Sequence, residues 1–254
     1  MITLITKQNY TQYQDLFKKN DPQTLKINHL IKAYGVGSLY CDFYVIEQDA
    51  PIGIFCKLES EILANLYSQN AVDDLHDFVN FAGATNVMLT CEFQNPDFSA
   101  FSGDCEVIQG TIFNRQYCFC DQTGDCEIKI DDFINLVADG FEDYEKAKTD
   151  NDFYQKFYCD ISHKIRHGIA KIYGQKDKWC VLRSIGNNFD ILSHIAVSPK
   201  LRGQNIGTIA VNKVSDIAKK DIVIYSRNSG TDVFYTKNGF KKSGNWYIIK
   251  AKEV

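Results

Sequence analysis

Residues 191–240 constrain the fold of this chain more than any other stretch of its sequence. Apolar and polar side chains alternate over 191–197, which predicts a strand that ends before Pro199. A polar loop at 202–207 leads into a segment whose apolar residues recur at helical spacing, namely Ile206, Ala210, Val214, Ile217 and Ala218. A second strand-like run and a short helix that carries Tyr235 follow. This order of strands and helices predicts a mixed α/β fold.

The polar loop ends where the predicted helix begins, at about 205–208. The first N–H groups of a helix lack intrahelical partners and the helix dipole favours negative charge, so such a loop is suited to an anion. Gly203 and Gly207 have no Cβ atom to block a ligand from the backbone, and Arg202 offers a fork of donors to phosphate. No Lys follows Gly207, which excludes the GxxxxGK[ST] nucleotide loop, and the GxGxxG dinucleotide fingerprint is also absent.

Two separate blocks within 191–240 resemble one known family. The first block is Ile195-Ala196-Val197-Ser198-Pro199-x-x-Arg202-Gly203-x-x-x-Gly207. It resembles the acyl-CoA-binding motif [Q/R]-x-x-G-x-[G/A] of the GNAT (GCN5-related N-acetyltransferase) superfamily, which lies between the fourth strand and the third helix of that fold. The second block is Asn228, Tyr235 and Gly239-Phe240. It is similar to the family's N-x(6)-Y-x-x-x-G-F pattern, and it stands at the family's usual separation from the first block.

One position departs from the family pattern, because Asn205 stands where the family usually has Gly. Asn is the residue other than Gly that most readily adopts φ > 0, so the loop is expected to keep its shape. A Cβ atom at this position would still crowd a bound pyrophosphate. The affinity for the cofactor, more than the mode of binding, therefore depends on Asn205.

The resemblance implies a cofactor, acetyl-CoA, and a set of residues that would bind it. These residues are Ile195, Ala196, Val197, Arg202, Gly203, Gln204, Asn205, Ile206, Gly207, Thr208, Asn228 and Tyr235. Within the set, loop N–H groups would hold the pyrophosphate, with Arg202 at the mouth of the loop. The backbone of Ile195 and Val197 would hold the acetyl carbonyl and the pantetheine arm. Asn228 would contact the cofactor arm, and Tyr235 would be the general acid.

Acetyl transfer to an amine makes chemical demands that these residues can meet. The amine must be neutral when it attacks, although a free alkylamine has a pKa of about 10.4. A tyrosine with a pKa of about 10 stays protonated near neutral pH, so Tyr235 can supply a proton to the leaving thiolate. The N–H of Val197 would polarise the thioester carbonyl. Because the thioester is already activated, positioning suffices and no covalent enzyme intermediate is required.

The general base is less clearly signalled than the general acid. His194 lies in the predicted strand beside the expected reaction centre, with Asp190 four residues earlier. An imidazole there can take the proton of the amine. A core histidine whose hydrogen bonds are satisfied explains the same residue equally well, and a chain of ordered water molecules is a further route for the proton.

The length of 254 residues, 44% of them hydrophobic, allows two domains of about 125 residues each. A polar break at 121–125 places the domains at 1–120 and 126–254. Predicted strands lie at 2–6, 41–47, 52–58, 61–67, 87–93, 169–173, 179–185 and 190–197, and predicted helices at 9–19, 24–33, 72–81, 130–144 and 151–158. We expect two tandem GNAT-like halves, each with a mixed α/β sheet. The N-terminal half has no R-x-x-G-x-G at 72–81, so it is expected to lack the pyrophosphate loop.

Other features of the sequence argue against several classes of protein. There is no signal peptide pattern and no apolar run long enough to span a bilayer, which predicts a cytoplasmic protein that binds no membrane. A net charge of −4 gives no reason to expect nucleic acid. The nine cysteines are expected to be free thiols, and Cys41, Cys56, Cys91, Cys159 and Cys180 stand in apolar runs that predict burial.

No metal site is predicted. His163 and His167 are spaced as a pair on one helix face, but no third ligand is signalled. The cysteines at 118, 120 and 126 lack the CxxC spacing of a zinc site. The aromatic residues Phe153, Tyr154, Phe157 and Tyr158 are expected to form helix core, with the alternative that one of them contacts substrate.

Three functions are compatible with the sequence. The first is an acetyl-CoA-dependent N-acetyltransferase, as a monomer or homodimer, that acetylates a primary amine by direct attack in a ternary complex. The second is a non-catalytic acyl-CoA-binding sensor or scaffold. The third is a plain α/β interaction domain that binds no CoA. The sequence does not specify the acceptor, which is open among small amines, amino acids, aminoglycoside-like compounds and protein amines.

Overall fold

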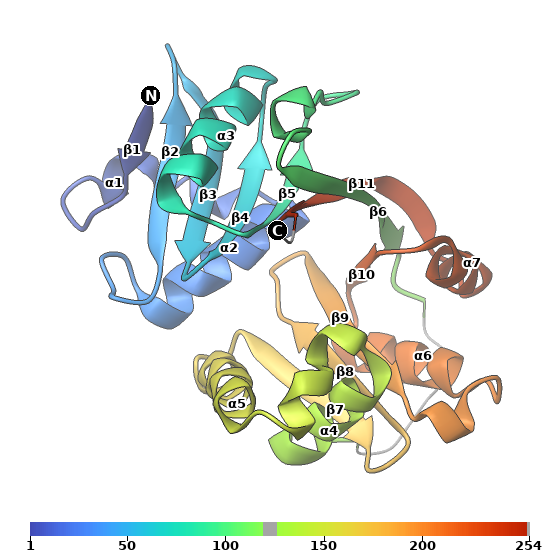
Figure 1. Ribbon diagram of the computed structural model, residues 1–254. Coiled ribbons are helices and arrows are strands. Elements are labelled where there is room, and N and C mark those ends of the chain that lie inside the picture. The colour runs from blue at the N-terminus through green and yellow to red at the C-terminus, as the bar shows by residue number, and fades with distance from the viewer. Residues whose placement is uncertain (119–125, 253–254) are drawn as a thin grey trace. The chain divides into compact units, whose positions relative to one another are not determined.

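The computed structural model describes residues 1–118 and 126–252, and it divides the chain into two compact units. The N-terminal unit comprises Met1–Ile112, Tyr225–Asp232 and Ser243–Val254. The C-terminal unit comprises Phe113–Ile224 and Val233–Lys242. Both units combine strands with helices, as the sequence predicts (Figure 1).

The N-terminal unit is built on a mixed sheet in the order β1-β2-β3-β4-β5-β11-β6. Its strands are β1 (Ile2–Leu4), β2 (Asp42–Glu47), β3 (Pro51–Leu58), β4 (Glu61–Leu66), β5 (Asn86–Cys91), β6 (Cys105–Arg115) and β11 (Lys241–Ala251). Strands β1 to β4 pair antiparallel in succession, β4 and β5 are parallel, and β11 pairs antiparallel with β5. The final strand of the chain therefore belongs to the sheet of the N-terminal unit.

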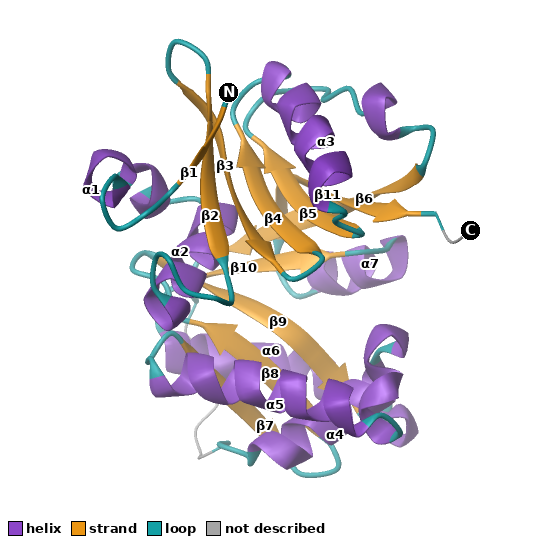
Figure 2. Ribbon diagram, turned by 60° about the vertical axis from the view of Figure 1, so that its left-hand side comes forward, coloured by secondary structure: helices purple, strands orange, loops and turns teal. Residues whose placement is uncertain are grey.

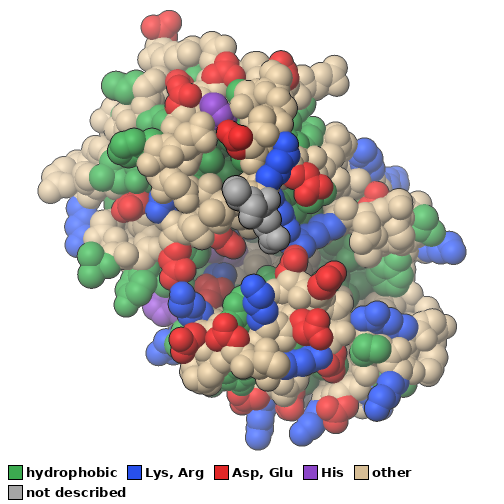
Figure 3. Space-filling model, viewed as in Figure 1, with side chains coloured by type: hydrophobic (Ala, Val, Ile, Leu, Met, Phe, Trp, Pro, Cys, Tyr) green, Lys and Arg blue, Asp and Glu red, His purple; other side chains and the backbone are tan. Residues whose placement is uncertain are grey.

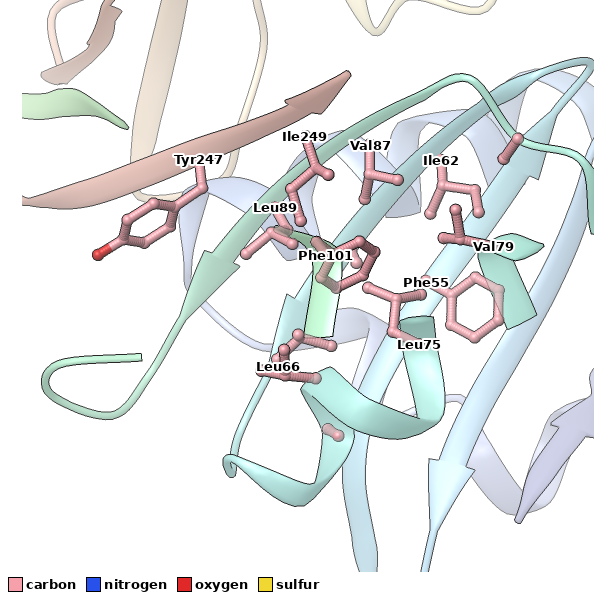
Figure 4. Packing of buried hydrophobic residues seen from close by; sticks show 14 of the residues in the cluster. Phe55, Ile62, Leu66, Leu75, Val79, Val87, Leu89, Phe101, Tyr247 and Ile249 are labelled. Atoms are coloured by element: carbon pink, nitrogen blue, oxygen red, sulfur yellow. The ribbon is translucent and has the colours of Figure 1, made fainter. Parts of the chain in front are cut away.

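Helices cover both faces of this sheet. On one face α3 (Asn70–Ala82) and the 3-10 helix η2 (Ser99–Phe101) bury an apolar cluster that Figure 4 shows, which includes Phe55, Ile62, Leu75, Val87, Phe101 and Ile249. On the other face lie α1 (Tyr10–Tyr13), η1 (Leu16–Lys18) and α2 (Pro22–Tyr34), packed on a second cluster around Phe17, Phe43 and Ile54. Helix α2 begins with a side-chain cap, because the Oδ1 atom of Asp21 accepts from the N–H of Thr24 at 2.8 Å.

The strands of the C-terminal unit follow the order β10-β9-β8-β7. Its elements are α4 (Ile130–Gly140), η3 (Glu142–Lys148), α5 (Asn151–Arg166), β7 (Ala170–Gln175), β8 (Trp179–Ser184), β9 (Phe189–Val197), η4 (Pro199–Leu201), α6 (Ile206–Ala218), most of β10 (Asp221–Ser226) and the second half of α7 (Ser229–Lys237). Strands β7, β8 and β9 are antiparallel, whereas β9 and β10 are parallel. Helices α4 and α5 cover one face of the sheet and α6 covers the other (Figure 2).

Most predicted elements are confirmed, and the exceptions have physical causes. The helix predicted at 9–19 is broken into α1 and η1. The helix predicted at 130–144 ends at Gly140, because Phe141 has an extended backbone, and the 3-10 helix η3 begins after it. Helix α5 runs to Arg166 rather than 158, since residues 159–166 keep the helical spacing of Ile161 and Ile165. Strands β6 and β11 were not predicted, because their pairing partners are distant in sequence.

The expectation for the cysteines is partly wrong. Cys41, Cys56 and Cys180 are buried, but Cys91 is only half-buried and Cys159 is exposed. On α5 the side chains that pack inward are Tyr154, Phe157, Tyr158 and Ile161, spaced three and four residues apart. Cys159 lies two positions from Ile161 and therefore points away from that face. Residues 119–125, which contain the predicted boundary and Cys120, lie outside the described residues.

The surface carries both signs of charge. On the face drawn in Figure 3, basic and acidic side chains are interspersed, consistent with a net charge of −4. Within residues 1–118 and 126–252, no helix is both long enough and apolar enough to cross a membrane.

Candidate active site

Strand β9 contains a bulge at His194. Cys180 of β8 pairs with Ala196, and Leu182 pairs with Ser193, so His194 and Ile195 together face a single residue of β8. His194 adopts φ = +48°, in the left-handed region. The extra residue changes which face of the sheet the following side chains meet.

The faces on either side of the bulge show this change. Leu192 packs with the α6 cluster, and a regular strand would place His194 on the same side. Instead His194 contacts the rings of Phe133 and Phe157 on the α4 and α5 side, and Ala196 packs there too. Ile195 returns to the α6 side. The bulge therefore places the imidazole on the face opposite to the one that a regular alternation predicts.

Strand β9 pairs with its neighbour β10 over only part of its length. Pairing with β10 covers only Phe189–Leu192, opposite Asp221–Ile224. Residues 193–197 continue β9 beyond this register, so in the described part of the chain the end of β9 lies past its pairing with β10. An extended ligand can use such an edge in strand-like fashion.

The corresponding strands of the N-terminal unit have neither feature. Strands β4 and β5 are also parallel and joined by a helix, α3, but they pair along their whole length, from Glu61↔Asn86 to Leu66↔Cys91. The register of β3 with β4 runs without a shift from Gly53↔Leu66 to Leu58↔Glu61. These two strand–helix–strand units are β4–α3–β5 and β9–α6–β10. The second has a bulge in its first strand and parallel strands that pair over only part of their length.

The loop between β9 and α6 has the backbone that the sequence suggested. Gly203 adopts φ = +76° and Asn205 adopts φ = +64°, so both lie in the left-handed region. Asn205 is the N-cap of α6, and no described side chain caps it. The first intrahelical bond runs from the N–H of Ile209 to the Asn205 carbonyl at 3.2 Å. The amides of 206–208 therefore precede the helical hydrogen-bond ladder.

Side chains of the loop bond to carbonyls of the preceding residues. Arg202 is exposed, and its Nε donates to the Val197 carbonyl at 3.4 Å. The Nε2 of Gln204 donates to the Lys200 carbonyl at 3.3 Å. These contacts fix the loop to the end of β9 and to η4. They also keep the Arg202 guanidinium beside the loop.

Gly207 lies close to Phe234 of α7, at the first turn of α6. A Cβ atom at Gly207 would lie 3.2 Å from the Cζ atom of Phe234 and 3.8 Å from the Cγ2 atom of Val197. The first of these separations is closer than ordinary van der Waals contact. A larger residue would force Phe234 away or fill the space in front of the amide.

The two residues of the second motif block lie in different surroundings. Tyr235 belongs to the C-terminal unit and is only 8% exposed. Its ring packs in an apolar cluster with the rings of Phe113, Phe234 and Phe240. Asn228 is grouped with the N-terminal unit, and its Oδ1 accepts from the N–H of Thr231 at 2.9 Å. The Asn228 side chain therefore caps α7.

His194 is held by two hydroxyl groups. Its Nε2 atom lies 2.9 Å from the Tyr144 hydroxyl, and its Nδ1 atom lies 3.3 Å from the Ser193 Oγ atom. Asp190, which precedes it in β9, does not serve as its partner. The Asp190 carboxylate is fully buried and pairs with Arg183, with an Oδ2 to Nε distance of 2.7 Å.

Cys180 lies directly behind the bulge but is not a nucleophile. Its Sγ atom is 3.8 Å from the carbonyl oxygens of both His194 and Phe133. Burial raises the pKa of the Cys180 thiol to about 12. The sulfur is therefore a neutral thiol near pH 7, whereas a reactive cysteine needs the thiolate.

Two site residues were missed by the sequence analysis. Arg115 donates to the Oδ1 atom of Asn212 on α6 at 2.8 Å and to the Asn238 carbonyl after α7 at 3.1 Å. It thus ties α6 to the end of α7. Tyr144 is the partner of His194. Each of these contacts joins segments far apart in sequence, so no local pattern signals it.

The described residues outside this site offer no metal centre. The rings of His163 and His167 lie 4.5 Å apart on and just after α5. Within the described ranges, no group of three or more His, Cys, Asp or Glu side chains is arranged to hold a metal ion.

Comparison with known proteins finds one family model and solved structures of similar fold. Residues 133–240 match the model of the acetyltransferase (GNAT) family. A tandem GNAT protein from the clavulanic acid biosynthesis pathway has 10% identity and a TM-score of 0.59, covering 99% of this chain and 98% of its own. A GNAT-family acetyltransferase from Colwellia psychrerythraea has 11% identity and a TM-score of 0.55, covering 99% and 100%. A GCN5-related N-acetyltransferase from Sphaerobacter thermophilus has 8% identity and a TM-score of 0.59, covering 100% and 96%.

Among the curated proteins, none matches this chain. The solved structures define the class of fold, which is two GNAT-like halves in tandem. Residues 133–240 form a domain of the acetyltransferase (GNAT) family, and the N-terminal half supplies a second unit of the same fold class.

Proposed function

We propose that the C-terminal unit transfers an acetyl group from acetyl-CoA to a primary amine by direct attack in a ternary complex. The observation that carries this proposal is the bulged end of β9, beyond its register with β10, beside the start of α6, which has no side-chain cap among the described residues. An extended edge and a set of helix N-terminal amides suit a ligand with an amide-bearing arm and a pyrophosphate. The N-terminal unit, with its fully paired β4 and β5, would not bind the cofactor.

The loop residues fit the pyrophosphate of CoA. The amides from Gln204 to Thr208 stand at the positive end of α6, and Arg202 adds a full charge beside them. The absence of Cβ atoms at Gly203 and Gly207 leaves room for phosphate oxygens close to the backbone. Ile195, Ala196 and Val197 would align the pantetheine arm along the open edge of β9.

In the proposed reaction the thioester supplies an activated carbonyl. The residues of the chain position the reactants and protonate the departing sulfur. The N–H of Val197 would polarise the carbonyl oxygen as negative charge develops there. The Tyr235 hydroxyl would give its proton to the departing sulfur, and His194 would receive the proton that the amine loses. The neutral state of the Cys180 thiol supports direct transfer over a cysteine-bound acetyl group.

The substitution Gly207→Val tests whether the loop at 202–207 binds the pyrophosphate of acetyl-CoA. The added isopropyl group would press on Phe234. We expect the affinity for acetyl-CoA, measured by isothermal titration, to fall by about tenfold, because the side chain would occupy space that phosphate oxygens need close to the backbone. The matched control is Gly103→Val, since a Cβ atom at Gly103 meets open space. Equal affinities for Gly207→Val and wild type would rule out this loop as the pyrophosphate site.

Asn205→Gly tests the departure from the family pattern. Glycine adopts φ = +64° without a steric cost and removes the Cβ atom, so we expect acetyl-CoA to bind about threefold more tightly. Lys219→Gly is the matched control, because Lys219 has φ = +53° at the other end of α6. It should relieve similar backbone strain without changing the affinity. A tighter complex for both variants would trace the gain to helix stability rather than to the loop.

A non-catalytic acyl-CoA sensor is the second candidate. It is favoured by the burial of Tyr235 in an apolar cluster and by the capping role of Asn228. The experiment that decides measures CoA release by the wild type with a panel of primary amines. Amine-dependent release supports the enzyme, whereas a rise in melting temperature with acetyl-CoA and no release supports the sensor. No response of the melting temperature to CoA would contradict both and leave an interaction domain.

A further inference from the structure

Both ring nitrogens of His194 lie within hydrogen-bond distance of a hydroxyl group. The Tyr144 hydroxyl lies 2.9 Å from Nε2, and the Ser193 hydroxyl lies 3.3 Å from Nδ1. Hydroxyl groups can both donate and accept, so each nitrogen is paired in either neutral tautomer. An amine that reaches His194 directly would first have to displace one of these hydroxyls.

Four aromatic rings lie around the imidazole of His194, which is half-buried. The centroid of the His194 ring lies 5.1 Å from that of Tyr144, 5.7 Å from Phe157, 6.2 Å from Phe133 and 6.3 Å from Phe141. These rings come from α4, η3, α5 and the residue between α4 and η3. In apolar surroundings of this kind, the transfer of a proton along a hydrogen bond costs less free energy than the entry of a charged ammonium group.

Tyr144 is well placed to be the outer member of this pair. It lies in η3 and is half-buried, between exposed residues on either side in sequence. Its own position is fixed, because its N–H donates to the Phe141 carbonyl at 3.1 Å. The ion pair of Lys148 with Asp139, at 2.8 Å, joins η3 to α4. The ring of Tyr144 also packs on the ring of Phe157, with centroids 5.0 Å apart.

We propose that Tyr144 relays the proton of the acceptor amine to His194, which makes it a catalytic residue of the reaction proposed above, on which this inference rests. The ammonium nitrogen gives a proton to the Tyr144 oxygen as the hydroxyl proton of Tyr144 passes to Nε2 of His194. The neutral amine then forms the C–N bond, and the C–S bond breaks with its electron pair on sulfur. Two protons leave nitrogen in total: one ends on the imidazole, and the other replaces the proton that Tyr235 gives to sulfur.

The test is a double-mutant cycle on kcat for amine acetylation. Tyr144→Phe keeps the ring and its packing but removes the hydroxyl. His194→Asn removes the proton acceptor while supplying a residue that tolerates φ = +48°, so the bulge is preserved. We expect each variant to lower kcat by about 10²-fold, with KM for acetyl-CoA unchanged, and the double variant to be no slower than either single one.

Two controls separate the relay from a structural role. Tyr158 lies on α5 and, like Tyr144, is half-buried. Tyr158→Phe removes its hydroxyl and should leave kcat at the wild-type value. Ser193→Ala removes the partner of Nδ1 and should also have little effect on kcat. The rise in melting temperature caused by acetyl-CoA should be the same for all variants, which shows that each is folded and binds the cofactor.

Several outcomes would overturn the relay. These are a Tyr144→Phe variant as fast as the wild type, losses that multiply in the double variant, or a loss of kcat in Ser193→Ala instead. Each of these leaves the acetyltransferase itself intact, because the wild type is active. A wild type that binds acetyl-CoA but acetylates no amine is a different result, and it overturns the proposed function and the relay together.

Discussion

Tyr235→Phe is expected to lower kcat for amine acetylation by about 10²- to 10⁴-fold, the usual contribution of a general acid. The thiolate of CoA would leave without a proton donor, so the loss should appear in kcat rather than in the affinity for acetyl-CoA. Calorimetric titration and steady-state CoA release measure the two quantities separately.

The folded structure should tolerate this change. The phenyl ring keeps the contacts of Tyr235 with Phe113, Phe234 and Phe240. Loss of the hydroxyl alone is expected to change the free energy of unfolding by about 1 kcal/mol. A kinetic loss far larger than this would therefore report the chemistry of the hydroxyl. If the variant turns over as fast as the wild type, Tyr235 is a core aromatic residue and another group protonates the sulfur.

Asp190→Asn is expected to destabilise the C-terminal unit by about 3–5 kcal/mol, because it leaves the buried guanidinium of Arg183 without its counter-ion. The pair is well shielded, with side-chain exposures of 0% for Asp190 and 10% for Arg183. The Arg183 Nε atom donates to the Asp190 Oδ2 atom at 2.7 Å, and the Arg183 Nη2 atom lies 2.6 Å from the same oxygen. An amide NH2 group in place of that oxygen would turn its own hydrogens toward both guanidinium nitrogens.

The control for Asp190→Asn is an ion pair of equal length at the surface. Lys164 and Asp160 lie 2.7 Å apart on α5, with side-chain exposures of 26% and 29%. Asp160→Asn should cost at most about 1 kcal/mol, because water solvates both partners when the pair is broken. Hydrogen exchange of the β8 and β9 amides, measured for each variant, reports the stability of this unit alone. Equal losses for the two variants would show that burial does not determine the strength of the Asp190 pair.

Much of the fold could be predicted because it rests on local patterns. Alternation over 191–197 and helical spacing from Ile206 to Ala218 predicted β9 and α6 closely. The positive φ angles at Gly203 and Asn205 also follow from local preference, since these two residue types adopt such angles at the lowest cost. Where a prediction failed, as at 9–19, a continuous pattern concealed a break between α1 and η1.

The site itself depends on contacts between distant residues. The bulge at His194 is a property of two strands, because it exists only relative to the register of β8. Alternation within β9 alone would place the imidazole on the α6 side. Arg115 and Asn212 are 97 residues apart, and His194 and Tyr144 are 50 apart. Nothing in the sequence around either member of these pairs indicates the other.

The sequence by itself determined the order of elements, the loop that suits a pyrophosphate and the family it resembles, because each depends on residues within a few positions of one another. Only the tertiary structure decided that β9 is bulged and open while β4 is regular and fully paired. It also decided that the Tyr144 hydroxyl lies beside the His194 imidazole and that the last strand joins the N-terminal sheet. These features arise from the pairing of distant segments, whose register is set by packing and hydrogen bonds across the whole unit.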